Sequence, residues 1–145
     1  MNTPCLRAAA DDFQNRLKHY VDLKIVELKD VPAKNKTVTQ VQEAESSRIL
    51  ENLPPRSYLV VLDRSGKQVS SSEFANFIEQ RRLHGPKVLA FAIGGPHGFS
   101  RTLLQRADWV LSLSKMTFPH EQTRVILLEQ IYRAFTILKG EKYHK

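Results

Sequence analysis

The stretch Phe91 to His120, FAIGGPHGFSRTLLQRADWVLSLSKMTFPH, contains two places where an apolar run stops at a loop. The first run, Val88 to Ile93, ends at the glycine-rich sequence GGPHG of residues 94–98. The second run, Trp109 to Leu113, continues into SKMTFPH. Ligands of open α/β sheets lie at the carboxyl ends of strands, so the stretch predicts two loops that share one ligand. A GGP sequence taken alone is also typical of a plain turn.

Composition narrows the class of protein. The chain has 145 residues, 41% of them hydrophobic and 26% charged, which predicts one soluble globular domain over residues 1–145. Twenty-two Lys and Arg against 15 Asp and Glu give a net charge of +7, which favours a polyanionic partner such as RNA; a solvated basic surface is the alternative. Because Cys5 is the only cysteine, an intrachain disulfide and a multi-cysteine metal site are excluded.

The sequence offers no apolar segment of signal-peptide or membrane-spanning length. We therefore expect a cytoplasmic protein with no membrane partner, and we assign no metal ligands.

The order of the elements predicts an α/β protein with a mainly parallel sheet flanked by helices. Residues 58–62 are continuously apolar, as in strands buried on both faces of a parallel sheet. Residues 29–39 are expected to form a loop and residues 63–67 a turn, and the spacing of Ser70 and Glu73 predicts a capping box. Strands are expected over residues 23–28, 57–62, 88–93 and 109–113, and helices over residues 6–20 and 41–53, after residue 70, after residue 100, and over 121–139.

The last expected helix is apolar almost all round, so it must be buried on more than one side, within the domain or against a second subunit. Gly140 follows it at the position where glycine commonly ends a helix.

Familiar phosphate-binding motifs do not account for the loops. GGPHG is not GxGxxG, and no GxxxxGK[ST] occurs. Dinucleotides and nucleoside triphosphates are therefore disfavoured as ligands.

Several spaced motifs carry a resemblance to a known family: IGGPHG, LSLSKMTFPH, the helix RVILLEQIYRAFTILKGEKYHK and the turn LDxxGK that starts at Leu62. Together they resemble the ribosomal large-subunit pseudouridine methyltransferase H family, which belongs to the SPOUT class of methyltransferases. The resemblance runs from about Leu6 to the last residue and is strongest from Leu59 onward.

The resemblance implies methyl transfer from S-adenosyl-L-methionine to the N-3 atom of a pseudouridine in large-subunit (23S-type) ribosomal RNA. It also implies a homodimer and a SPOUT-type fold whose carboxyl-terminal part is threaded as a trefoil knot. Family members begin with a short apolar strand, for which this chain offers only residues 1–5, so the first family strand is expected to be missing.

The resemblance assigns the cofactor-binding positions to the last residue of the first buried strand, to one glycine and to a continuous run of six residues. These positions are Leu62, Gly94, Leu113, Ser114, Lys115, Met116, Thr117 and Phe118. Backbone groups there can bind the edge of an adenine, and Leu62, Leu113 and Met116 can supply apolar walls to its faces. Core packing is the alternative role for Leu113 and Met116.

Candidate catalytic residues are His144, Arg124 and His120. His144 lies in a tail that matches the family's terminal pattern, and that tail is expected to close the active site and meet RNA; a frayed terminus is the alternative. His120 begins a helix, where the macrodipole favours a neutral ring, although it could equally act only as a cap. The candidate RNA-binding residues are Arg133, Lys142, Tyr143 and Lys145.

Arg124 and Arg133 interrupt an apolar helix, so each must reach a phosphate, a carboxylate or water, and each could instead be a dimer contact. Two readings besides the methyltransferase stay open at this point. A non-catalytic ribosome or RNA-binding module would bind RNA without a cofactor, and an inactive dimerisation protein would bind neither.

Overall fold

A computed structural model describes residues 2–145 of the chain, and it divides into two compact units. The first, called the strand unit, consists of residues 26–68 and 85–117. The second, called the helical unit, consists of residues up to 25, residues 69–84 and residues 118–145. Each unit is described by itself.

The strand unit is built on a three-stranded parallel sheet of order β2-β1-β3. Its strands are β1 (Tyr58–Lys67), β2 (Leu89–Ile93) and β3 (Trp109–Leu111). The central strand β1 is buried from Leu59 to Leu62. A strand that pairs on both edges and is covered on both faces has no polar side, which is why these residues form one apolar run. The predicted parallel α/β architecture is confirmed.

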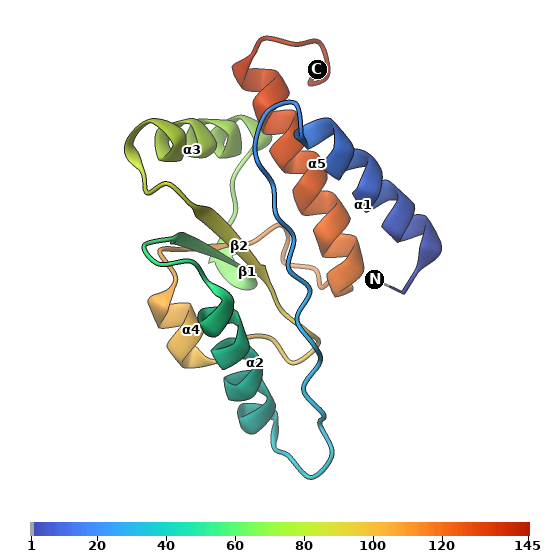
Figure 1. Cartoon of the computed structure of the whole chain (residues 1–145), viewed down its shortest axis with the longest axis vertical. Coiled ribbons are helices and arrows are strands. Elements are labelled where there is room, and N and C mark those ends of the chain that lie inside the picture. The colour runs from blue at the N-terminus through green and yellow to red at the C-terminus, as the bar shows by residue number, and fades with distance from the viewer. Residues whose placement is uncertain (1) are drawn as a thin grey trace. The chain divides into compact units, whose positions relative to one another are not determined.

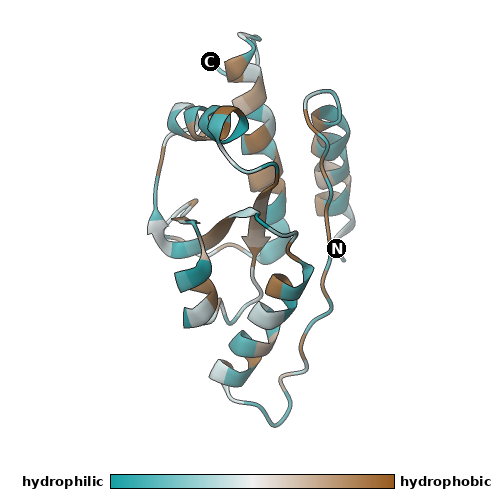
Figure 2. Cartoon of the chain, turned by 60° about the vertical axis from the view of Figure 1, so that its left-hand side comes forward, coloured by the Kyte–Doolittle hydropathy of each residue, from teal (hydrophilic) through white to brown (hydrophobic). Residues whose placement is uncertain are grey.

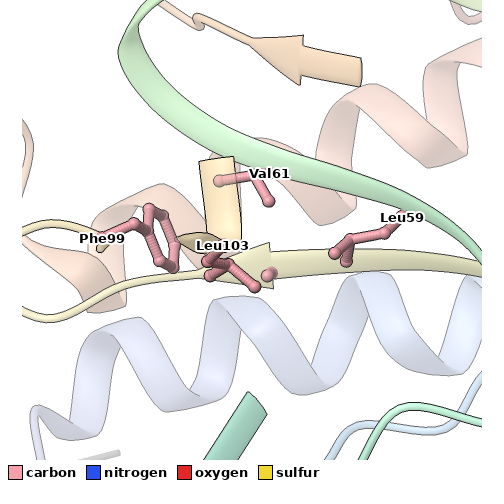
Figure 3. Packing of buried hydrophobic residues seen from close by; sticks show 5 residues of the cluster. Leu59, Val61, Phe99 and Leu103 are labelled. Atoms are coloured by element: carbon pink, nitrogen blue, oxygen red, sulfur yellow. The ribbon is translucent and has the colours of Figure 1, made fainter. Parts of the chain in front are cut away.

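Two helices, α2 (Val38–Asn52) and α4 (Arg101–Arg106), lie beside the sheet of the strand unit (Figure 1). The core that they share with the sheet centres on Leu59, Val61, Phe99 and Leu103, with half-buried residues of α2 packed around it (Figure 3). Ser100 caps α4 by accepting a hydrogen bond from the backbone N–H of Leu103 at 3.1 Å. Phe99 therefore enters the core directly before the helix begins.

The expected turn at residues 63–67 proves to be an irregularity inside β1. Leu111 of β3 pairs with both Leu62 and Lys67, so the four residues between them lie outside the regular register. The Asp63 carboxylate accepts a hydrogen bond from the backbone N–H of Ser65 at 3.0 Å, which is the turn chemistry that the sequence suggested. The prediction that the strand ends at Leu62 was wrong, because pairing resumes at Lys67.

Gly66 is required by this irregularity. A Cβ added there would lie 2.5 Å from the carbonyl oxygen of Val110, so no other residue fits without a backbone shift.

The expected strand over residues 23–28 was wrong. The described chain forms no regular element between the end of α1 and the turn before α2, and no strand of residues 2–145 pairs with this segment. Lys24 and Glu27 interrupt the apolar residues here, and Val26 is half exposed. A segment with strand propensity but no neighbouring strand has no partners for its backbone hydrogen-bonding groups, so it does not form a strand. The expected loop that follows is confirmed up to Thr37, which begins the capping box of α2.

The helical unit contains α1 (Pro4–Leu17), α3 (Ser71–His84) and α5 (His120–Leu138). The predicted capping box opens α3: Ser70 accepts a hydrogen bond from the backbone of Glu73, whose carboxylate accepts one from the backbone of Ser70. Both α1 and α3 pack on α5.

The helix that leads to the carboxyl terminus carries hydrophobic residues along its length (Figure 2). Every residue of α5 from Thr123 to Leu138 is buried or half-buried, which confirms the prediction of burial on more than one side. Gly140 follows α5 with a φ of 68°, the left-handed conformation expected of a glycine that ends a helix.

Candidate functional site

Leu62 of β1 lies level with Ile93 and Leu111, the last residues of β2 and β3, because it is the register partner of both. The loops that follow β2 and β3 therefore leave the sheet on either side of Leu62. We call this place the strand-end edge, made of Leu62 with residues 94–98 and 112–117. The expectation that Leu62 and the two loops meet at one edge of the sheet is confirmed within the strand unit.

The loop after β2 keeps its backbone close to the sheet. A Cβ on Gly94 would lie 2.9 Å from the Phe99 ring, so any larger residue here would require that ring to move. Gly98 has a φ of 76° and its N–H donates to the carbonyl oxygen of Gly95 at 3.1 Å. From α2, the side chain of Gln42 donates to the carbonyl oxygen of His97. The loop is thus fixed by a tight turn and by a contact from the neighbouring helix.

The loop after β3 is held by its own serines. The N–H of Ser112 donates to the carbonyl oxygen of Lys67 at 2.9 Å, and its hydroxyl donates to the carbonyl oxygen of Ser114 at 2.9 Å. The Ser114 hydroxyl in turn accepts from the N–H of Met116 at 3.0 Å. These bonds order the backbone without using the side chains of Lys115, Met116 or Thr117, which are all exposed.

Met116 is the informative residue of this loop. Its side chain is 74% exposed, the highest value among the large hydrophobic residues found exposed in the structure. Core packing, the alternative role for Met116, is therefore wrong, while Leu113 is half-buried and Leu62 is buried. An exposed thioether can cover the face of a flat heterocycle.

The strand-end edge has the kinds of chemical group that an adenosine-type cofactor requires. It offers backbone groups from two ordered loops, apolar side chains at Leu62 and Leu113, and the exposed Met116. No group of three or more His, Cys, Asp or Glu side chains in residues 2–145 is arranged to hold a metal ion. No helix of the described residues is both long and apolar enough to cross a membrane.

The remaining candidates belong to the helical unit. Phe118 is half-buried and is the first residue of the last segment of this unit, residues 118–145. His120 is the exposed first residue of α5. Next to it, Glu121 accepts a hydrogen bond from the N–H of Asn2 at 2.6 Å, and bonds from the Thr3 side chain and from Asn2 lower the Glu121 pKa. Arg124 is half-buried one turn further along α5 and has contacts of its own.

The tail after α5 is folded back onto the helix rather than frayed. Arg133 contacts Glu129 and His144, and its guanidinium lies 4.9 Å from the centre of the Tyr143 ring. Tyr143 also packs edge-on against Tyr132. Burial, followed by the Glu129 carboxylate, raises the pKa of Tyr143. The helical unit thus brings together three of the candidates, Arg133, Tyr143 and His144, and leaves the lysines at 142 and 145 exposed.

A second contact fixes the base of the tail. The Tyr20 hydroxyl donates to the Glu141 carboxylate at 2.8 Å, and that bond raises the pKa of Tyr20 to about 12.

Sequence reasoning missed Glu129. A carboxylate on a helix is usually a solvated residue, but this one is four residues before Arg133 on a nearly apolar helix. That spacing puts both side chains on one face and was the available signal.

Comparisons with known proteins identify the family of this chain. The family model described as "Predicted SPOUT methyltransferase" matches residues 1–144. Ribosomal RNA large subunit methyltransferase H of Clostridium botulinum (strain Loch Maree / Type A3) is 46% identical over 144 residues, which cover 97% of this chain and 91% of that protein. The protein of the same name from Carboxydothermus hydrogenoformans is 44% identical with the same coverage. The chain, whose sheet is parallel, belongs to the SPOUT methyltransferase family.

Proposed function

We propose that this chain is a methyltransferase that uses S-adenosyl-L-methionine to methylate N-3 of a pseudouridine in large-subunit ribosomal RNA. The observation that carries the proposal is the strand-end edge, where two ordered loops and an exposed Met116 flank the buried Leu62. Family membership supports methyl transfer as the reaction, and the names of the relatives support large-subunit ribosomal RNA as the substrate.

S-adenosylmethionine, when bound, supplies a methyl group activated by a sulfonium sulfur. The residues that would hold it are Leu62, Gly94 and the run from Leu113 to Phe118. Their part is to bind the adenosine and to orient the methyl group toward the acceptor nitrogen, because alignment of donor and acceptor is the main requirement of such a displacement. Gly94 contributes by letting the Phe99 ring pack directly against the loop backbone, where a Cβ would lie 2.9 Å from that ring.

The acceptor nitrogen lies between two carbonyl groups and carries a weakly acidic proton. That proton must leave as the methyl group arrives, and the negative charge that develops spreads onto the carbonyl oxygens. A positioned donor at either oxygen would stabilise this charge. His144, Arg124 and His120 are the candidate catalytic side chains, and all three belong to the helical unit.

The net charge of +7 supports a polyanionic substrate. The exposed lysines Lys142 and Lys145 flank the docked part of the tail, and with Arg133 and Tyr143 they are the proposed RNA contacts. We further propose that both units form one SPOUT-type domain that works as a homodimer in the cytoplasm, with the carboxyl-terminal trefoil knot expected of its class.

Isothermal titration with S-adenosylmethionine tests the cofactor assignment. We expect stoichiometric binding to the full chain. The variant Gln42→Ala removes the side-chain hydrogen bond from α2 to the loop after β2. A chain that binds ribosomal RNA in a salt-dependent way but shows no heat with the cofactor would be the non-catalytic RNA-binding module instead.

A further inference from the structure

The carboxyl-terminal tail is ordered around one carboxylate, Glu129. Its Oε1 atom lies 2.8 Å from Nε and 2.5 Å from Nη2 of Arg133, and it accepts a hydrogen bond from the Tyr143 hydroxyl at 3.3 Å. The side chains of Glu129 and Arg133 are 18% and 26% exposed, so both charges are mostly withdrawn from water. Separating such a pair would leave each charge unpaired and mostly out of water, which is costly. The two side chains therefore keep a defined geometry.

Tyr143 reinforces the placement of the guanidinium. Its ring lies against Arg133 at 4.9 Å and against the Tyr132 ring at 4.8 Å. Burial and the Glu129 carboxylate raise the pKa of Tyr143, which favours the protonated phenol that donates to Glu129. The guanidinium of Arg133 is thus held on one edge by a carboxylate and on one face by an aromatic ring.

The remaining edge of Arg133 decides the state of His144. Nη1 of Arg133 lies 3.1 Å from Nδ1 of His144. Arginine has only hydrogen-bond donors, so Nδ1 must be the acceptor and must carry no proton. A neutral imidazole whose Nδ1 is unprotonated carries its hydrogen on Nε2. While this contact lasts, Nδ1 accepts the hydrogen bond from Arg133 and Nε2 carries the hydrogen. His144 then has no free lone pair with which to remove a proton.

We propose that Glu129, acting through Arg133, is a positioning residue that fixes His144 as the Nε2–H tautomer, so that His144 donates a hydrogen bond to a carbonyl oxygen of the target base. The inference rests on the proposed function and deepens it. His144 then stabilises the charge that develops on the base, and the proton of N-3 passes to solvent water. In this scheme Arg133 holds His144 in one tautomer, a role that a residue contacting only an RNA phosphate would not have.

The tautomer can be read directly by NMR. In the full chain labelled with ¹⁵N-histidine, in mildly alkaline buffer, long-range ¹H–¹⁵N correlations distinguish a protonated from an unprotonated ring nitrogen. The chain has five histidines, and the His144 signals are those lost in His144→Gln. We expect unprotonated Nδ1 and protonated Nε2 at His144, and a proton on Nδ1 would overturn the proposal.

Two substitutions at His144 separate a donor from a base. A glutamine amide can accept from Arg133 through its oxygen and donate through its nitrogen, but it cannot take up a proton. His144→Gln should therefore stay within about tenfold of the wild-type kcat, whereas His144→Ala should lose about 10²- to 10³-fold, the usual cost of removing one such donor. Equal losses in the two variants would identify His144 as a proton acceptor and overturn the proposal.

The role of Glu129 is tested with a matched control. Glu129→Gln should lower kcat and convert the His144 spectrum to a mixture of tautomers while the Kd for S-adenosylmethionine is unchanged. Glu79→Gln removes a more exposed pair within one helix, in which Glu79 lies 3.0 Å from Arg82 on α3, and should change neither the kcat nor the His144 spectrum. An unaltered His144 spectrum in folded Glu129→Gln would refute the positioning role.

If the wild-type chain transferred no methyl group, the proposed function would fall and the NMR experiment would still decide the tautomer.

Discussion

Replacing Met116 by alanine is the sharpest test of the strand-end edge, because the folded protein makes little use of this side chain. The thioether is 74% exposed, and the one hydrogen bond of Met116 in the loop comes from its backbone N–H, which alanine keeps. Fully burying a methionine side chain is worth about 1.5–3 kcal/mol. The exposed three-quarters therefore leave about 1–2 kcal/mol to be gained when a ligand covers it.

This free energy corresponds to an increase of about five- to thirtyfold in the Kd for S-adenosylmethionine. Isothermal titration measures the Kd, and denaturant unfolding measures stability, which should change by no more than about 0.5 kcal/mol, as for surface substitutions in general. Leu83→Ala is the matched control, since Leu83 is also a large hydrophobic residue, 59% exposed, and lies on α3 outside the candidate site. It should leave both quantities unchanged.

An unchanged Kd in Met116→Ala would show that no ligand covers this side chain. A loss of stability of several kcal/mol would show that Met116 packs in the folded protein. Either result refutes the reasoning.

Two further predictions concern folding. Gly94→Ala should lower the free energy of unfolding by about 1–3 kcal/mol, because its Cβ would meet the Phe99 ring at 2.9 Å; in denaturant titrations the loss should shrink when Phe99 is first replaced by leucine, and an undiminished loss would contradict the steric explanation. Tyr20 has a pKa raised to about 12 by its bond to Glu141, so its contribution to stability is full below about pH 10, the usual tyrosine value, and is lost as the pH rises toward 12. Tyr20→Phe should remove this alkaline loss, and a variant with the wild-type pH profile would exclude Tyr20 as its origin.

Much of the strand unit could be predicted because its signals are local. A continuous apolar run marks a strand buried on both faces, and residues 58–62 proved to be the centre of the sheet. The loops containing Gly94 and Ser114 were predictable from where such runs stop. The common level of Leu62, Ile93 and Leu111 was not local information, but it follows from parallel pairing once the strands are known.

The failures have a common cause, since each depended on what a segment meets in space. Residues 23–28 have the composition of a strand but no pairing partner among the described residues. The turn at Asp63 could not reveal that β1 resumes pairing at Lys67. Similarly, Glu129 and Tyr143 are 14 residues apart, and only the reversal of the chain after α5 brings them within hydrogen-bonding distance.

The central claim is that this chain methylates large-subunit ribosomal RNA with S-adenosylmethionine as donor. The most direct measurement incubates the purified protein and methyl-labelled S-adenosylmethionine with ribosomes that lack the modification, and maps the label by mass spectrometry of RNA fragments. The account predicts one labelled pseudouridine in the large-subunit RNA, methylated at N-3. A folded protein that binds the donor and transfers no label to that RNA would contradict it.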